Sequence, residues 1–200
     1  MSINVKTNTS ALTALNQLNR TSRALARNFE KISTGLRIAR AADDAAGLGV
    51  ADSLRADHHS ADQAARNVND GISMIGVAEG ATNEISNILT RLRELAIQSS
   101  SETLANTERS YIQDETIQLV SEVSRIAAVT EFNGVHLTDG TVTSLDVQVG
   151  IQNTSADRIA ILLGDLTTSA LGINTLSLAT VTNAQAAIDV IDTALAVVSQ

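Results

Sequence analysis

Apolar side chains recur every three or four positions over two long stretches of this chain, and this spacing limits its fold more than any other feature. The first stretch contains Leu12, Leu15, Leu18, Ser22, Leu25, Phe29, Ile32 and Leu36. The second runs from Val68 to Ala96 with the same period. Steps averaging about 3.5 residues are typical of helices that bury one edge against a partner helix. Because the chain has no proline, we expect long uninterrupted helices.

A short joint connects the two patterns. Arg37 and Arg40 stand where the first helix is expected to end, since cations favour the negative end of the helix dipole. Asp43 or Asp44 is expected to cap the next helix by accepting hydrogen bonds from its first free N–H groups. Counted from Asp44, the second pattern predicts a helix of about 55 residues, which is the length of a rod. Three glycines inside it are interpreted as sites of close helix approach: Gly71, Gly76 and Gly80.

Charge is divided unevenly along the chain. Residues 1–40 carry seven basic residues against Glu30 alone, a net charge of +6, and the remainder carries −14. The basic residues are Lys6, Arg20, Arg23, Arg27, Lys31, Arg37 and Arg40. A helix with an apolar edge and a basic edge suits an anionic membrane, a nucleic acid or a partner helix. The strict spacing favours a partner helix, and the acidic remainder with few aromatic residues argues against nucleic acid.

The rest of the chain changes period twice. A return helix is expected along Ile112, Thr116, Leu119, Val123 and Ile126. Alternating apolar residues from Leu145, an apolar run from Arg158 to Leu163 and turn signals at 139–140 and 152–153 predict a small region of two β-hairpins. A helical pattern from Ala184 to Val198 stops at Gln200 in mid-pattern. The predicted fold class is mainly α, a long coiled-coil-like rod with a small β-hairpin region.

The composition argues against catalysis and against bound cofactors. The chain has no Cys, so disulfides and thiolate metal sites are excluded. Aromatic residues make up 2% of it, which suits close helix packing better than a ligand pocket. His58 and His59 are adjacent and point about 100° apart on a helix, and His136 is isolated. We therefore expect no enzyme activity, no metal site and no cofactor, and the absence of a long apolar run predicts no membrane insertion.

Five sequence blocks resemble the N-terminal portion of bacterial flagellin, in the family's order and with consistent spacing. They are "INVKTNTSALTALNQLNRT" at the start, the joint at 33–48, "LTRLRELAIQSS" at 89–100, "EFNGVHL" at 131–137 and "LDVQVG" at 145–150. The joint carries Ala39, Arg40 and Ala42 where flagellins often have Asn, Ser and Lys. These differences alter the surface of the joint and leave its caps unchanged.

The resemblance implies a structural subunit that polymerises into the flagellar filament for motility, secreted through the flagellar type III export apparatus and located outside the cell. It implies an inner-tube helix at 1–42, a rod domain at 43–180 and the start of a truncated C-terminal rod helix at 181–200. The residues expected to pack between subunits are Leu18, Leu25, Phe29, Ile32 and Leu36. Alternatives are a hook–filament junction protein and a membrane-active secreted translocator.

The resemblance also implies an outside partner, since flagellins are recognised by the innate immune receptor Toll-like receptor 5. The matching positions here are Arg91, Leu95 and Glu115. Arg91 and Leu95 are four residues apart and share a helix face. Glu115 joins them only if the return helix packs antiparallel on the rod. The other interpretation is that Leu95 belongs to the helix–helix seam and Arg91 is simply solvated.

Overall fold

The computed structural model describes residues 8–199 and divides the chain into two compact units between His59 and Ser60. Four helices dominate: α1 (Thr9–Thr34), α2 (Ala45–Ser99), α3 (Asn106–Val129) and α4 (Val181–Val198). Four short strands lie between α3 and α4: β1 (Glu131–Phe132), β2 (Val135–His136), β3 (Ser144–Gln148) and β4 (Arg158–Leu162). The predicted mainly helical class with a small β-hairpin region is confirmed.

The first unit contains α1, the joint and the beginning of α2. Asn8 caps α1 by accepting a hydrogen bond from the Ala11 N–H at 3.0 Å. The helix ends earlier than the positions of Arg37 and Arg40 suggested, because Gly35 adopts the left-handed conformation with φ of 69°. Only a residue without a side chain adopts that conformation easily, so Gly35 ends the helix and the basic residues that follow lie in the joint.

The start of α2 agrees with the sequence. The Asp44 carboxylate accepts a hydrogen bond from the Gly47 N–H at 2.9 Å, so Asp44 is the predicted cap. From Ala45 the helix continues without a break for 55 residues, the length that the pattern predicted.

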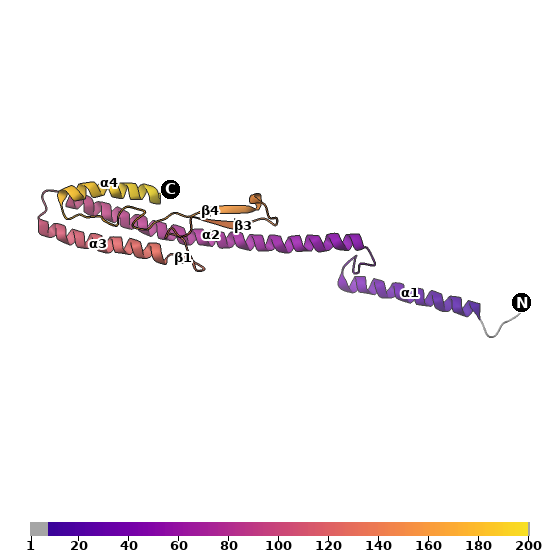
Figure 1. The fold of residues 1–200 in the computed structure, drawn as a ribbon. Coiled ribbons are helices and arrows are strands. Elements are labelled where there is room, and N and C mark those ends of the chain that lie inside the picture. The colour runs from indigo at the N-terminus through magenta and orange to yellow at the C-terminus, as the bar shows by residue number, and fades with distance from the viewer. Residues whose placement is uncertain (1–7, 200) are drawn as a thin grey trace. The chain divides into compact units, whose positions relative to one another are not determined.

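The core of the second unit lies where α3 and α4 run along the C-terminal half of α2 (Figure 1). Its fully buried side chains come from all three helices and from the connection before α4, and include Ile85, Leu89, Leu92, Val123, Ile173, Leu178 and Ile191. α4 is long and apolar enough to suit a membrane span by composition. In the structure one face of it, including Ile191 and Val198, is buried in this core, which accounts for its apolar character.

Two antiparallel hairpins lie between α3 and α4. Only the second, β3–β4, is where the sequence predicted one, with the 152–153 turn signal inside its loop, whereas the 139–140 signal joins no hairpin. β1 and β2 are joined by Asn133-Gly134, both with positive φ, the geometry of a tight hairpin turn. β3 pairs with β4, with Leu145 opposite Ile161 and Val147 opposite Ile159. The sequence prediction did not use the Asn-Gly pair as a turn signal, although Asn-Gly is among the strongest short signals for a hairpin.

The glycines of α2 do not mark close helix approach. A Cβ atom at Gly71 would lie 3.4 Å from Val147, so Gly71 faces the β3–β4 hairpin. Gly76 and Gly80 have no neighbouring atom within 4 Å of that position. The interpretation of these three residues as helix–helix contacts is therefore wrong for this fold.

Candidate functional site

The apolar edge of α1 has no cover among the described residues of the first unit, 8–59. We call it the α1 seam, defined by Leu18, Leu25, Phe29 and Ile32 with Leu36 beyond the helix end. None of the 26 residues of α1 is buried, and the exposed fraction of the Ile32 side chain reaches 77%. These are the residues predicted to pack between subunits. An apolar stripe at coiled-coil spacing that stays in water is a surface for another helix.

Two ion pairs and the half-buried Ile38, which packs close to Gly47 at the start of α2, hold the joint after α1. The Arg40 guanidinium meets the Glu30 carboxylate through two contacts of 2.8 Å, a fork that spans ten residues of sequence. The Lys31 Nζ lies 3.4 Å from the Asp43 carboxylate. Desolvation acts to raise the pKa of Asp43, but the hydrogen bond from the Ala39 N–H and the charge of Lys31 outweigh it, and the pKa is lowered. Both pairs are partly solvent-exposed, so each contributes little to stability and serves mainly to orient the joint.

The three residues predicted to bind a receptor lie close together in the second unit but are exposed to different degrees. The Arg91 guanidinium donates to the Glu115 carboxylate at 2.9 and 3.0 Å and to the Glu94 carboxylate at 2.9 Å. The pairing of Arg91 with Glu115 requires α3 to return along α2, as the sequence interpretation required. Leu95 is only 1% exposed and belongs to the helical core. A ligand arriving from solvent therefore meets the charged pair, with Leu95 beneath it.

Several residues that join the elements of the second unit were missed by sequence analysis. Arg109 is buried, and its guanidinium donates to the Ser99 carbonyl at 3.0 Å and to the Ser101 carbonyl at 2.6 Å, which fixes the turn between α2 and α3. Arg93 on α2 holds Asp192 on α4 at 2.6 Å. The hydrogen bond from Arg93 lowers the pKa of Asp192. Partners 10 and 99 positions apart leave no periodic signal, so only the folded chain reveals them.

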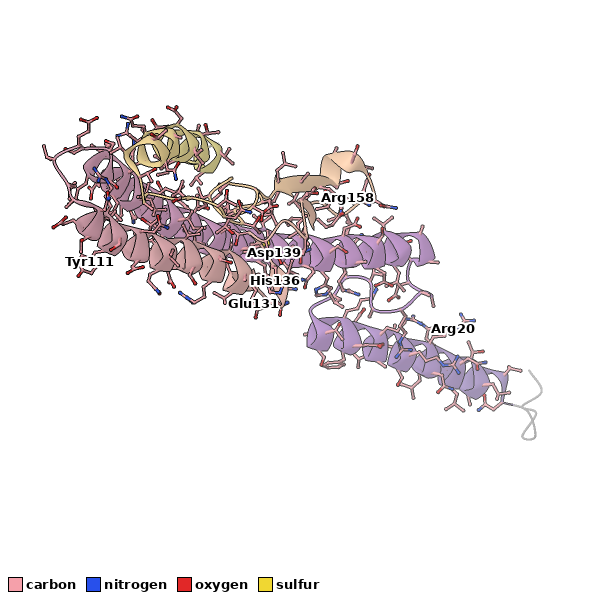
Figure 2. The ribbon with its side chains drawn as sticks, turned by 60° about the vertical axis from the view of Figure 1, so that its left-hand side comes forward. Arg20, Tyr111, Glu131, His136, Asp139 and Arg158 are labelled. Carbon is pink, nitrogen blue, oxygen red and sulfur yellow. The ribbon has the colours of Figure 1, made fainter. Side chains whose placement is uncertain are left out.

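Two of the three histidines, His58 and His59, are neighbours on α2, and the third, His136, ends β2. The rings of His58 and His59 lie 6.1 Å apart and edge to face, and both side chains are exposed on α2. His136 ends the first hairpin, and Asp139 follows it in the connection (Figure 2). The hydrogen bonds from Thr141, followed by the nearby His136, lower the pKa of Asp139. The expected absence of a metal site stays a prediction.

Comparison with known families decides the identity of this arrangement. The family described as "Bacterial flagellin N-terminal helical region" matches residues 5–143 of this chain. The chain belongs to the bacterial flagellin family. The matched residues include α1, the joint, α2, α3 and the first hairpin, so they contain both the α1 seam and the Arg91–Glu115 pair.

Individual flagellins are similar over most of the chain. A flagellin of Halalkalibacterium halodurans is 44% identical over 172 residues, which cover 86% of this chain and 63% of that protein. A flagellin of Clostridium tyrobutyricum is 44% identical over 170 residues, 83% of this chain and 45% of that protein. The crystal structure of Bacillus cereus flagellin matches 67% of this chain and 77% of that chain, with a TM-score of 0.59 and 32% identity. The chain thus spans less than two thirds of the length of these curated flagellins.

Proposed function

We propose that this chain is the N-terminal part of a flagellin that polymerises into the flagellar filament and serves motility. The observation that carries the proposal is the α1 seam, an apolar edge of coiled-coil spacing with no buried residue. A helix of this kind gains most of its stability from packing against a partner. In a polymer the partners are helices of the same subunit and of its neighbours. Membership of the flagellin family supports this choice over a hook–filament junction protein or a membrane-active translocator.

The same proposal assigns a place to each segment. The inner-tube segment is 1–42, whose described helix is α1 (Thr9–Thr34). The rod domain is 43–180, and 181–200 is the start of a C-terminal rod helix. The work is structural and involves no catalytic step. Filament subunits act outside the cell, so we propose export through the flagellar type III apparatus and an extracellular location.

Polymerisation of the complete gene product tests the role of the α1 seam. The double substitution Phe29→Ser and Ile32→Ser removes two exposed apolar side chains from it, and we expect loss of filaments in electron microscopy and sedimentation. Asn28→Ser on the same turn is the matched control and is expected to leave assembly intact. Wild-type filaments from the double variant would contradict the role of this seam. The 200-residue chain alone is expected to stay monomeric, and ordered tubes formed by it would contradict the need for further helices.

We extend the proposal to recognition by Toll-like receptor 5 through Arg91 and Glu115, with Leu95 as support beneath them. Charged pairs at the centre of an interface lose on the order of 2 kcal/mol or more on truncation, or roughly 30-fold in affinity. We expect this loss for Arg91→Ala, and a loss for Leu95→Ala through altered packing of the charged pair. The control is Arg125→Ala, which removes an exposed ion pair on α3 with Glu122 at 2.6 Å. If both site variants bind the receptor like the parent, with the fold intact by circular dichroism, the site assignment is wrong.

A further inference from the structure

A small cleft with three arginines lies beside the joint, inside the first unit. It is lined by Arg23, Ala26, Arg27, Glu30 and Arg40, and its volume is about 280 Å³. The first four residues follow helical spacing along one face of α1, and Arg40 returns from the joint to close the cleft. This volume is below the range of roughly 300–1,000 Å³ that is typical of pockets for organic ligands. A compact ion fits it better than a cofactor does.

The lining carries a net charge of +2. Glu30 engages Arg40 through both carboxylate oxygens, which holds that guanidinium in place as one wall of the cleft. Arg23 and Arg27 have no acidic partner among residues 8–199. The charge of two guanidiniums thus remains unbalanced within a single concave surface, which concentrates positive potential there.

The other carboxylates of the joint are already occupied. Asp43 accepts from Lys31 and from the Ala39 N–H. Asp44 caps α2 through the Gly47 N–H. Neither is free to neutralise Arg23 or Arg27 without giving up a contact that shapes the joint. Arg23 and Arg27 are exposed and are therefore open to an anion from solution.

We propose that this cleft binds a phosphate-type dianion, either free phosphate or the phosphate monoester headgroup of a lipid. Guanidinium groups donate paired N–H groups in a planar fork that matches two oxygens of one phosphate. Two unpaired guanidiniums and a third fixed by Glu30 surround the space in which such an ion sits. The charge of the lining selects a dianion over a monoanion.

Titration of the full chain with inorganic phosphate tests the site, read on the arginine Nε–H signals by NMR and on amide hydrogen exchange. We expect saturable shifts of Arg23, Arg27 and Arg40 and slower exchange in residues 20–40, because a ligand that binds only the folded joint stabilises it. Acetate, a monoanion, is expected to bind far more weakly. Rising sodium chloride is expected to weaken the phosphate response by screening.

Arg27→Gln keeps the helix propensity of α1, and Arg40→Gln acts in the joint outside any helix. Each removes one guanidinium and is expected to weaken binding about tenfold or more. Arg20→Gln is the matched control, since Arg20 lies on the same helix outside the cleft (Figure 2) and its loss is expected to leave the affinity unchanged. Equal responses of Arg20 and the cleft arginines would mean diffuse charge attraction and would overturn the proposal. So would the absence of a selective response to either phosphate source.

Vesicles of phosphatidylcholine with a minor fraction of phosphatidic acid separate the two sources. Vesicle binding that free phosphate displaces, and that Arg27→Gln weakens, identifies the lipid headgroup as a ligand of the same cleft. If Arg27→Gln leaves vesicle binding intact, that binding comes from the apolar edge of α1 and the lipid headgroup is excluded as a ligand of the cleft. The titration with soluble phosphate then decides whether the cleft binds phosphate.

Discussion

α1 and the C-terminal half of α2 carry the same apolar spacing, but the apolar edge of α1 is exposed and that of α2 is buried. Leu25 in α1 is 54% exposed, whereas Leu92 in α2 is completely buried between α3 and α4. The difference does not lie in the helices themselves, since both are long and both have regular apolar edges. It lies in whether the described chain supplies partners for the edge. The pattern predicts the need for a partner but not where that partner comes from.

Hydrogen exchange of the monomer should give the largest contrast. Opening a helix without buried side chains costs almost no free energy, whereas opening the helical core costs up to the global stability, about 5–15 kcal/mol for typical domains. Amides of α1 are therefore expected to exchange orders of magnitude faster than those around Leu92 and Val123. NMR or mass spectrometry measures this directly. Equal protection of α1 and the core would break the comparison.

A matched pair of leucine substitutions should separate the two regions in stability. Leu92→Ala leaves a cavity in the core and is expected to cost about 2–5 kcal/mol of unfolding free energy. Leu25→Ala on the exposed edge of α1 is expected to change it by less than about 0.5 kcal/mol in the monomer. Urea unfolding followed by circular dichroism measures both. A large cost for Leu25→Ala would show that the edge is covered in solution.

Breaking a polar contact should cost more unfolding free energy in the second unit than in the first. Arg109→Met removes the side-chain donor of the Ser99 carbonyl and the closer of two donors of the Ser101 carbonyl, which keeps the Leu104 N–H at 3.4 Å. It is expected to cost about 1–3 kcal/mol. Arg40→Met breaks the solvent-exposed fork with Glu30 and is expected to cost less than about 1 kcal/mol. The same urea unfolding experiment compares the two. Equal costs would mean that the joint is as tightly folded as the core.

Replacing glycines of α2 that have no close neighbour should raise the unfolding free energy by a smaller amount. Gly76→Ala is expected to stabilise the monomer by roughly 0.5–1 kcal/mol, because alanine favours the helix and the added methyl group meets no neighbour. Gly71→Ala is expected to gain less, since its methyl group contacts Val147 at 3.4 Å. Thermal unfolding of the two variants distinguishes them. A destabilised Gly76→Ala monomer would point to a close neighbour at that position.

The smallest expected effect is a change in the stability of the second unit as the pH falls into the acid range. The pKa of Asp192 is lowered from its ordinary value of 3.8 chiefly by the hydrogen bond from Arg93. The pair therefore contributes stability above that ordinary value and loses it as the pH falls through the lower folded value. Asp192→Asn is expected to lower the melting temperature slightly at neutral pH and to match the parent in strong acid. Asp43→Asn, at the joint, is the control and is expected to leave the melting of the core unchanged at both pH values.

The local elements of this chain follow from short-range physics that a sequence carries openly. The absence of proline allowed a 55-residue helix, Asp44 supplied its cap, alternation marked β3, and an apolar run marked β4. Each of these depends on residues a few positions apart, so pattern and capping rules reach them. The same rules placed the end of α1 too late, because the basic residues after it outweighed the simpler signal of Gly35.

The tertiary structure decided which faces were buried and which charges met. Toward the C-terminal end of α2, Leu89 and Leu92 are buried by helices. In its middle part, Gly71 and Met74 are buried, because β-hairpins and not helices cover that part. Leu95 went into the core while Arg91, four residues earlier, stayed at the surface with Glu115. Arg40 pairs with Glu30, and Arg109 donates hydrogen bonds to the carbonyls of Ser99 and Ser101. The spacing of these partners follows no helical or strand period, so the sequence pattern does not reveal them. Burial and long-range pairing depend on what packs against each residue, and that is settled only when the whole chain has folded.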